Sequence, residues 1–230
     1  MGGKPVKVLL INGSPRKNGN TAAALSAIEK ELAAQQIETV SIQVGNQAIR
    51  GCMACGGCRR TSGGLCVFTE DPVNECVRLM AECDGLVIGS PVYYSGIAGT
   101  MKSFLDRFFY CGGGQLCAYK PVAGVVALRR SGGVDAFHQM NNYFNLANAL
   151  IVPSFYWNAI HGMRPGEAQQ DMEGIQIMEN IGRNMAWMLK TLEYSAPLCR
   201  CRKNIRVLPR ILFGKMYLKG ALLSGSALFR

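Results

Sequence analysis

The stretch Lys7-Val-Leu-Leu-Ile-Asn-Gly-Ser-Pro-Arg-Lys-Asn-Gly-Asn-Thr21 decides the fold of this chain. Residues 7–11 are a short run of mainly β-branched and aliphatic side chains, which is typical of a buried strand. Residues 12–15 are turn formers, and residues 21–36 then place Ala, Leu and Ile at helical spacing. The stretch therefore predicts a strand, a loop and a helix in succession.

The same alternation continues to about residue 192. We expect further strands at residues 37–44, 84–89, 121–128 and 149–155, and further helices at residues 72–82, 97–109, 134–148 and 174–192. Strands that alternate with helices form a parallel sheet covered on both faces. The prediction is an α/β fold, a three-layer doubly wound five-stranded parallel sheet in residues 1–194, with a cysteine-rich insert at 50–70 and a basic, apolar C-terminal tail at 195–230.

Composition limits the class of protein. A chain of 230 residues with 49% hydrophobic and 17% charged residues is long enough for one sizeable globular domain. The apolar run at residues 8–11 is too short for a signal peptide or a membrane span, so we expect a cytoplasmic protein. In the cytosol the ten cysteines are expected to be metal ligands or buried thiols rather than disulfides.

Residues 13–21 combine glycines, hydroxyls and cations where the first strand turns into the first helix. Backbone N–H groups at a helix N-terminus bind anions, and Ser14 and Thr21 add hydroxyl donors while Arg16 and Lys17 add positive charge. The pattern is neither G-x-x-x-x-G-K-[ST] nor G-x-G-x-x-G, which disfavours a nucleotide triphosphatase or an ordinary dinucleotide fold. We expect a site for a phosphate monoester; the alternative is a polar turn with a helix cap.

A second loop, Gly89-Ser-Pro-Val-Tyr-Tyr-Ser-Gly96, follows the third predicted strand. Ligands of open α/β sheets lie outside the carboxyl ends of the strands, where both loops are expected. A third Gly-rich turn, residues 129–133, follows the fourth strand and would face the same side; an ordinary loop is the alternative there. Asp106 and Arg107 come later in a helix, where such a pair is typical of a structural hydrogen-bonding site.

The motifs GSPRKNGNT at 13–21 and SPVYYSGIAGTMKSFLDR at 90–107 together resemble the NADPH-dependent FMN reductase branch of the flavodoxin-like superfamily, over about residues 7–192. The resemblance implies FMN as cofactor and NAD(P)H as electron donor. It implies a flavin phosphate held by Ser14, Arg16, Asn20 and Thr21. It places the isoalloxazine edge against Pro91, Val92, Tyr93, Tyr94, Ser95 and Gly96, and we expect a third contact at Ser131 and Gly132.

Four cysteines follow the spacing C-x2-C-x2-C-x7-C at Cys52, Cys55, Cys58 and Cys66. Thiolates at this spacing can wrap one compact cluster, whereas structural zinc usually takes two separated pairs, so the pattern favours [4Fe–4S] over zinc. It also resembles the iron–sulfur flavoproteins of the same superfamily. Metal-free thiols remain an alternative.

The other cysteines fall outside this spacing. Cys76 and Cys83 lie in a predicted amphipathic helix and are expected to be core residues. Cys111, Cys117, Cys199 and Cys201 have no assignment.

The tail carries much of the net charge of +10, since residues 195–230 hold eight Lys or Arg and no acid. Interleaved with apolar residues, these cations predict packing on another subunit, in a homodimer or homotetramer. Contact with an anionic membrane surface or with an acidic electron-transfer partner are the alternatives. Nothing in the chain resembles a nucleic-acid-binding module.

Three functions are consistent with these patterns. The first is an FMN-dependent oxidoreductase that passes electrons from NAD(P)H to a flavin, a quinone or a similar small-molecule acceptor. The second is an iron–sulfur flavoprotein that exchanges electrons with a ferredoxin-like protein. The third is a non-enzymatic flavodoxin-fold interaction protein.

Overall fold

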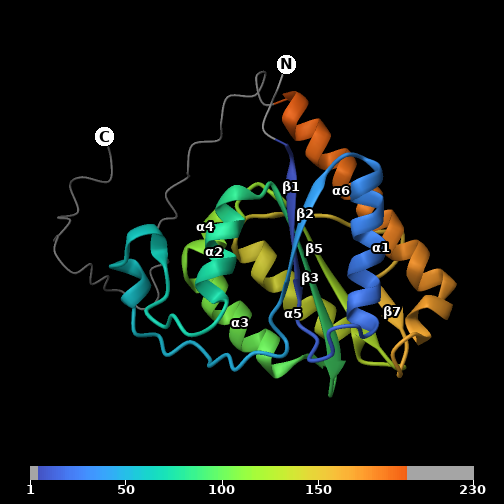
Figure 1. Cartoon of the computed structure of the whole chain (residues 1–230), viewed down its shortest axis with the longest axis horizontal. Helices are drawn as coiled ribbons and strands as arrows, with labels where there is room; N and C mark the ends of the chain where they lie inside the picture. The colour runs from blue at the N-terminus through green and yellow to red at the C-terminus, as the bar shows by residue number, and fades with distance from the viewer. Residues whose placement is uncertain (1–4, 196–230) are drawn as a thin grey trace, which may run out of the picture. The chain divides into compact units, whose positions relative to one another are not determined.

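The computed structural model describes residues 5–195, in which a parallel sheet lies between two layers of helices (Figure 1). The sheet has the order β2-β1-β3-β5-β6. Its four long strands are β1 (Lys7–Asn12), β2 (Glu38–Gln43), β3 (Gly85–Tyr93) and β5 (Pro121–Leu128). Their pairing is parallel throughout, with Val8 of β1 opposite Thr39 on one side and Gly85 on the other. The predicted doubly wound α/β fold is confirmed.

The fifth strand is broken into two short pieces, β6 (Leu150–Ile151) and β7 (Ala159–His161), which pair with opposite ends of β5. The prediction of one continuous strand at 149–155 is therefore wrong. Val152 still donates to the Val122 carbonyl at 2.8 Å, but the next residue, Pro153, has no N–H to continue the ladder. The chain leaves the sheet there and returns at Asn158.

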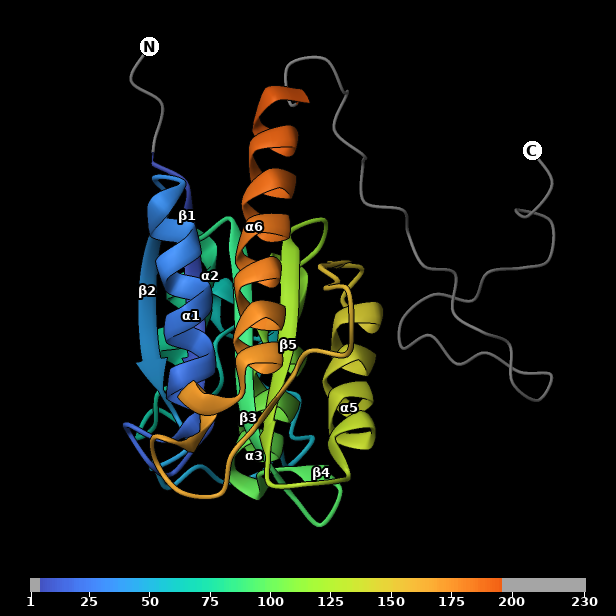
Figure 2. The ribbon, with the colours of Figure 1, turned by 90° about the vertical axis from the view of Figure 1, so that its right-hand side faces the viewer.

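The sheet's two faces are covered by different helices, as Figure 2 shows from the side of α1 and α6. Val8 and Leu10 of β1 pack with α1 (Asn20–Ala34) and α6 (Met172–Ser195). Leu9 and Ile11 alternate to the opposite face. The helices on that face are α2 (Val73–Glu82), α3 (Gly99–Tyr110), α4 (Gly112–Leu116) and α5 (Gly133–Leu146). Each predicted helix is present, and α4 is an addition.

The cysteine-rich insert lies between β2 and α2 and contains two short 3-10 turns, η1 (Gly57–Arg59) and η2 (Ser62–Gly64). Cys76 and Cys83 are buried in the core behind it, as predicted, and so is Cys117 of the α4–β5 connection. Two other short elements were not predicted. They are β4 (Gly96–Ile97), which pairs antiparallel with β3, and η3 (Glu167–Gln170).

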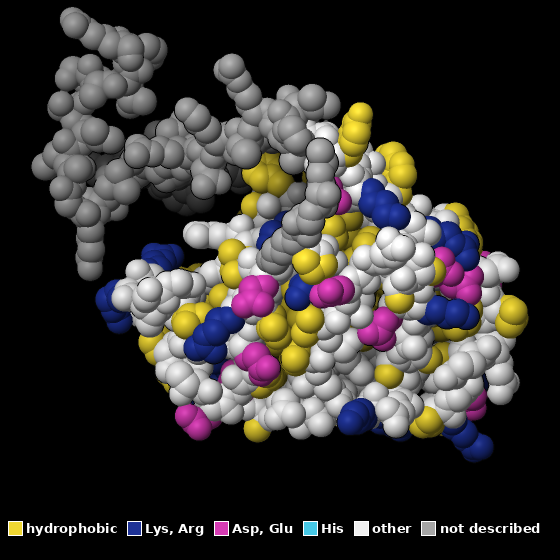
Figure 3. Space-filling view, turned by 45° about the horizontal axis from the view of Figure 1, so that its top comes forward, with side chains coloured by type: hydrophobic (Ala, Val, Ile, Leu, Met, Phe, Trp, Pro, Cys, Tyr) yellow, Lys and Arg dark blue, Asp and Glu magenta, His cyan; other side chains and the backbone are white. Residues whose placement is uncertain are grey.

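The molecular surface toward the amino ends of the strands mixes cations, acids and apolar side chains (Figure 3). Within residues 5–195, no helix is both long and apolar enough to cross a membrane. The predicted tail lies outside the described residues apart from Ser195, together with Cys199 and Cys201, so its proposed roles stay predictions.

Candidate functional site

A cleft opens at the carboxyl ends of β1, β3 and β5, where the sequence predicted a ligand. Seven predicted residues line it together: Ser14, Arg16, Asn20, Thr21, Pro91, Val92 and Tyr93. The other predicted residues, Lys17, Tyr94, Ser95, Gly96, Ser131 and Gly132, are not part of this lining. Six further residues complete the cleft: Gly19, Ala127, Leu128, Arg129, Gly162 and Met163.

The loop before α1 has the geometry of an anion cradle. Gly19 precedes the helix and no side chain caps its first turn, which contains no acid. The first N–H groups of α1 are therefore open to an anion, which the helix dipole favours. The Ser14 hydroxyl accepts a hydrogen bond from the Arg16 N–H at 3.1 Å, which leaves its own O–H free to donate.

Close backbone contacts hold this loop in place. The Gly13 N–H donates to the Gly89 carbonyl at 2.8 Å, which ties the first loop to β3. A Cβ at Gly45 would lie 2.3 Å from the Gly13 carbonyl, so no larger residue fits there. The Asn20 side-chain oxygen accepts from the Ala168 N–H at 3.3 Å and fastens η3 to the start of α1.

The second loop is a tight hairpin between β3 and β4. Tyr94 and Ser95 at its tip both have positive φ, at 50° and 62°, which is strained for residues other than glycine. Two side chains fix the return strand: Gln139 accepts from the Ile97 N–H at 3.2 Å, and Ser90 accepts from the Ala98 N–H at 3.1 Å. Tyr93 is turned into the cleft lining, whereas Tyr94 is fully exposed to solvent.

The third predicted region, at Ser131 and Gly132, packs against the tip of the second loop. Gly132 has φ 83° and is the N-cap residue of α5, and its backbone lies against Ser95 at the hairpin tip. Gly162 and Met163 were missed because they follow β7, the piece of the fifth strand that periodicity did not reveal. Arg129 follows β5 directly, and its position at a strand's carboxyl end is the signal that identifies it.

The cleft suits a phosphorylated flavin. In the described part of the chain none of its lining residues is acidic, while Arg16 and Arg129 are cations. The open helix N-terminus lies at one end of this lining and Tyr93, with its flat ring, lies in the second loop. An anionic group and an aromatic ring system therefore both find matching chemistry here.

A second cavity lies in the insert and is lined by five cysteines, the predicted Cys52, Cys55, Cys58 and Cys66 together with Cys111. Cys111 directly follows the last residue of α3, so tertiary packing, and not the cysteine spacing, brings it to the cavity. Cys52 and Cys55 are exposed, whereas Cys58 and Cys111 are buried. Burial, together with the neighbouring Cys66 and Cys58 thiols, raises the pKa of Cys111 to about 12.

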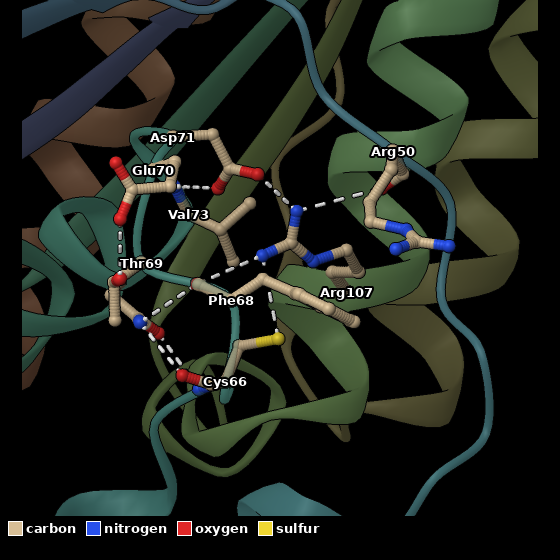
Figure 4. A network of polar contacts seen from close by, with 9 residues as sticks. Arg50, Cys66, Phe68, Thr69, Glu70, Asp71, Val73 and Arg107 are labelled. Atoms are coloured by element: carbon tan, nitrogen blue, oxygen red, sulfur yellow. Dashed lines mark hydrogen bonds and ion pairs between the residues drawn. The ribbon is translucent and has the colours of Figure 1, made fainter.

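Polar contacts fix one wall of this cavity, the segment around Cys66 (Figure 4). Asn74 accepts from the Cys66 N–H at 2.7 Å and donates to the Cys66 carbonyl at 2.8 Å. Arg107 donates to the Cys66 sulfur at 3.3 Å and forms a buried ion pair with Asp71. Arg107 of the Asp–Arg motif thus contacts the insert, whereas the Asp106 carboxylate accepts hydrogen bonds from Lys102 of the same helix and from Tyr143 of α5.

The donor chemistry of the cavity fits an iron–sulfur cluster, because thiols gather around an apolar space with a hydrogen-bond donor to one sulfur. The space itself is small, about 20 Å³, which holds roughly one water. Among residues 5–195, no three candidate side chains already stand as ligands of a single metal ion. A cluster would need more space than this, so some of the thiols would have to move apart to hold one.

Comparison with known proteins identifies the family of this chain. The family model for NADPH-dependent FMN reductase matches residues 6–163. An iron–sulfur flavoprotein of Methanocaldococcus jannaschii is 30% identical over 196 residues, covering 82% of this chain and 100% of the relative. One from Archaeoglobus fulgidus is 35% identical over 164 residues, covering 70% of this chain and 71% of the relative. A solved archaeal flavodoxin superposes with a TM-score of 0.55 at 15% identity, covering 80% of this chain and 99% of that chain.

The fold and the cleft define a flavodoxin-like flavoprotein. The chain belongs to the NADPH-dependent FMN reductase family and, within it, to the iron–sulfur flavoproteins. It is therefore a flavin-dependent oxidoreductase with FMN as its cofactor.

Proposed function

We propose that this chain is an electron-transfer flavoprotein that binds FMN in the carboxyl-edge cleft and a [4Fe–4S] cluster on Cys52, Cys55, Cys58 and Cys66. The observation that carries the proposal is the gathering of these four thiols around one apolar cavity, beside a buried arginine that donates to a sulfur. Relatives that match most of this chain are named iron–sulfur flavoproteins.

One rigid element connects the two sites. Helix α3 begins at Gly99, directly after the hairpin that borders the cleft, and ends at Tyr110, which lines the cysteine cavity. Gly51, just before the cysteines, approaches Ser103 in the middle of the same helix. A change in the position of α3 would therefore move both sites together.

FMN supplies two-electron and one-electron chemistry when bound, and an iron–sulfur cluster supplies one-electron chemistry. The chain's own residues bind and orient these groups. The α1 N-terminus and Ser14 hold the phosphate, the hairpin at Tyr93 positions the ring, and the buried Cys58 and half-buried Cys66 keep the inner side of the cluster away from water.

The proposal includes two candidate electron donors. NAD(P)H is one candidate, supported by the family's description and by Arg16 and Arg129, which suit the phosphates of a dinucleotide. A ferredoxin-like protein is the second, supported by the exposed Arg60, two residues after Cys58, which suits an acidic partner. The acceptor is expected to be a flavin, a quinone or a similar small molecule.

The test is flavin, iron and sulfide analysis of protein purified without oxygen. We expect about one FMN and about four irons per chain. Cys55→Ser should lose the iron and keep FMN, whereas Met53→Ala, which alters a non-ligand residue of the same cavity, should keep both. FMN without iron in the wild type would leave a plain flavin reductase with a thiol-rich loop.

Donor choice is then measured by following flavin reduction with NADPH, NADH or a reduced ferredoxin. A ferredoxin that reduces the wild type, and no longer reduces Cys55→Ser, would favour the protein donor. Equal reduction of both forms by NADPH would favour the nicotinamide.

A further inference from the structure

Arg107 is the largest fully buried side chain described, with 1% of its surface exposed. A buried guanidinium loses its hydration, so its presence requires compensating partners. Asp71, also buried, supplies the opposite charge. If Arg107 served only to pair with Asp71, the two would be expected to form the two parallel hydrogen bonds that are usual between arginine and a carboxylate.

The contacts of Arg107 are instead spread toward the cysteine cavity. One terminal nitrogen, Nη1, meets Asp71 and the Arg50 carbonyl at 3.5 Å. The other, Nη2, donates to the Phe68 carbonyl at 3.2 Å and to the Cys66 sulfur at 3.3 Å. Figure 4 shows these contacts converging on the guanidinium from the segment at residues 66–71 and from Arg50.

One hydrogen-bond donor of Arg107, its Nε–H, takes no part in these contacts. Its Nε–H is buried and has no hydrogen-bond partner among the described residues, although an orphaned buried donor costs about 1–3 kcal/mol. Arg107 lines the cysteine cavity. A buried cation that lines a cavity of thiols and donates to one of their sulfurs indicates that the cavity is built for an anionic occupant.

We propose that Arg107 is a positioning residue for the cluster, which holds Cys66 as a ligand and sets the cluster's reduction potential. This inference rests on the proposed function. A cluster held by four thiolates is negatively charged, and its negative charge grows on reduction. Hydrogen bonds to the sulfurs and a nearby cation stabilise the reduced state more than the oxidised state, and so raise the potential.

Asp71 has the opposite effect in this arrangement. Its carboxylate neutralises part of the Arg107 charge, so removing the carboxylate strengthens the positive field at Cys66. The two partners of one ion pair should therefore shift the potential in opposite directions. A purely structural ion pair predicts the same kind of damage from either substitution.

The experiment compares Arg107→Lys, Asp71→Asn and Arg59→Gln in the full chain, purified without oxygen. Arg59 is an exposed cation that bonds the Tyr110 hydroxyl at 3.2 Å beside the same cavity, which makes it the matched control. Iron and FMN contents are measured first, and the cluster's midpoint potential then follows from a redox titration monitored by electron paramagnetic resonance.

We expect Arg107→Lys, which keeps the positive charge but loses the terminal nitrogen that donates to the Cys66 sulfur, to lower the potential. A tenfold change in the reduced-to-oxidised ratio corresponds to about 59 mV for one electron. Asp71→Asn should raise the potential, and Arg59→Gln should leave it near the wild-type value. If Arg107→Lys does not fold, the direction of the Asp71→Asn shift decides alone.

Shifts in the same direction, or no shift in iron-loaded variants, would overturn the role of Arg107 and leave the proposed function intact. A wild type that binds FMN but no iron would overturn the proposed function and this inference with it.

Discussion

The backbone of Gly132 lies directly against the side chain of Ser95, so that a Cβ at Gly132 would stand 2.6 Å from the Ser95 Oγ. Ser95 is at the strained tip of the hairpin that borders the flavin cleft, and Gly132 is the N-cap residue of α5. The start of one helix therefore sets the position of a loop that is close to it only in the folded protein.

Gly132→Ala should weaken FMN binding because the added methyl group displaces the hairpin tip. Gly166→Ala is the matched control: Gly166 also has positive φ, at 94°, but a Cβ there meets nothing within 4 Å. Both substitutions carry the same backbone penalty, of order 1 kcal/mol. FMN titrations followed by flavin fluorescence should show a larger loss for Gly132→Ala. Equal affinities would mean that the hairpin tip does not bear on the flavin.

Ser14→Ala should reduce the affinity for FMN more than the affinity for riboflavin. The Ser14 hydroxyl shapes the loop through the Arg16 N–H and is placed to donate to a phosphate. Hydrogen bonds to charged groups contribute about 1.5–3 kcal/mol, or roughly 10- to 150-fold in affinity. Ser154→Ala, which removes a hydroxyl bonded to the Ile177 carbonyl far from the cleft, is the control. An equal loss for both flavins would place the phosphate elsewhere.

Much of this fold is predictable from residues 7–21, because a buried strand, a turn and an amphipathic helix leave few topologies open. The fifth strand was the exception. Residues 149–155 are mostly apolar and predict one strand, yet β6 ends after Ile151 and β7 begins only at Ala159. Pro153 was visible in the sequence, but β7 has only three residues and is too short to carry a periodic signal.

The residues of the candidate sites likewise form two groups, those that the sequence could place and those that it could not. Residues adjacent to a strand end, such as Ser14 and Tyr93, could be placed on the cleft because strand ends define where ligands bind. Cys111 and Arg107 could not be placed at the cysteine cavity, since α3 carries them there through tertiary packing. The spacing of residues along the sequence does not indicate such a tertiary contact.

Alkaline pH should destabilise the fold in part through Cys76. Burial raises the pKa of this thiol from 9.0 to about 12 in the folded chain. Between these values the unfolded chain loses the thiol proton and the folded chain retains it, so stability falls as pH rises through that window. The contribution is about 1.4 kcal/mol per pH unit.

Urea denaturation of the reduced protein at pH 7, 9 and 10.5 measures this effect. Cys76→Ala should be less stable at pH 7, because it leaves a small cavity, but should lose less stability between pH 9 and 10.5. Other titrating groups are shared, so the difference in slope isolates Cys76. Parallel slopes would show that the thiol ionises without cost in the folded chain.

Asn158→Ala should destabilise the broken edge of the sheet. The buried Asn158 side chain donates to the Gly124 carbonyl of β5 at 3.1 Å, at the point where the fifth strand is missing. Its own carbonyl accepts from the Val126 N–H at 2.9 Å, which the substitution leaves in place. Removing the amide leaves a buried carbonyl without a partner, at about 1–3 kcal/mol.

The control for this prediction is Asn184→Ala. Asn184 donates to the Pro153 carbonyl at 2.8 Å and so braces the same segment, but from a more exposed position where water can replace it. Urea denaturation should therefore show a clearly smaller loss of stability for Asn184→Ala. Because β7 leads to Gly162 and Met163 in the cleft, Asn158→Ala should also weaken FMN binding. Equal and small losses from both variants would mean that β7 is held by its ladder with β5 alone.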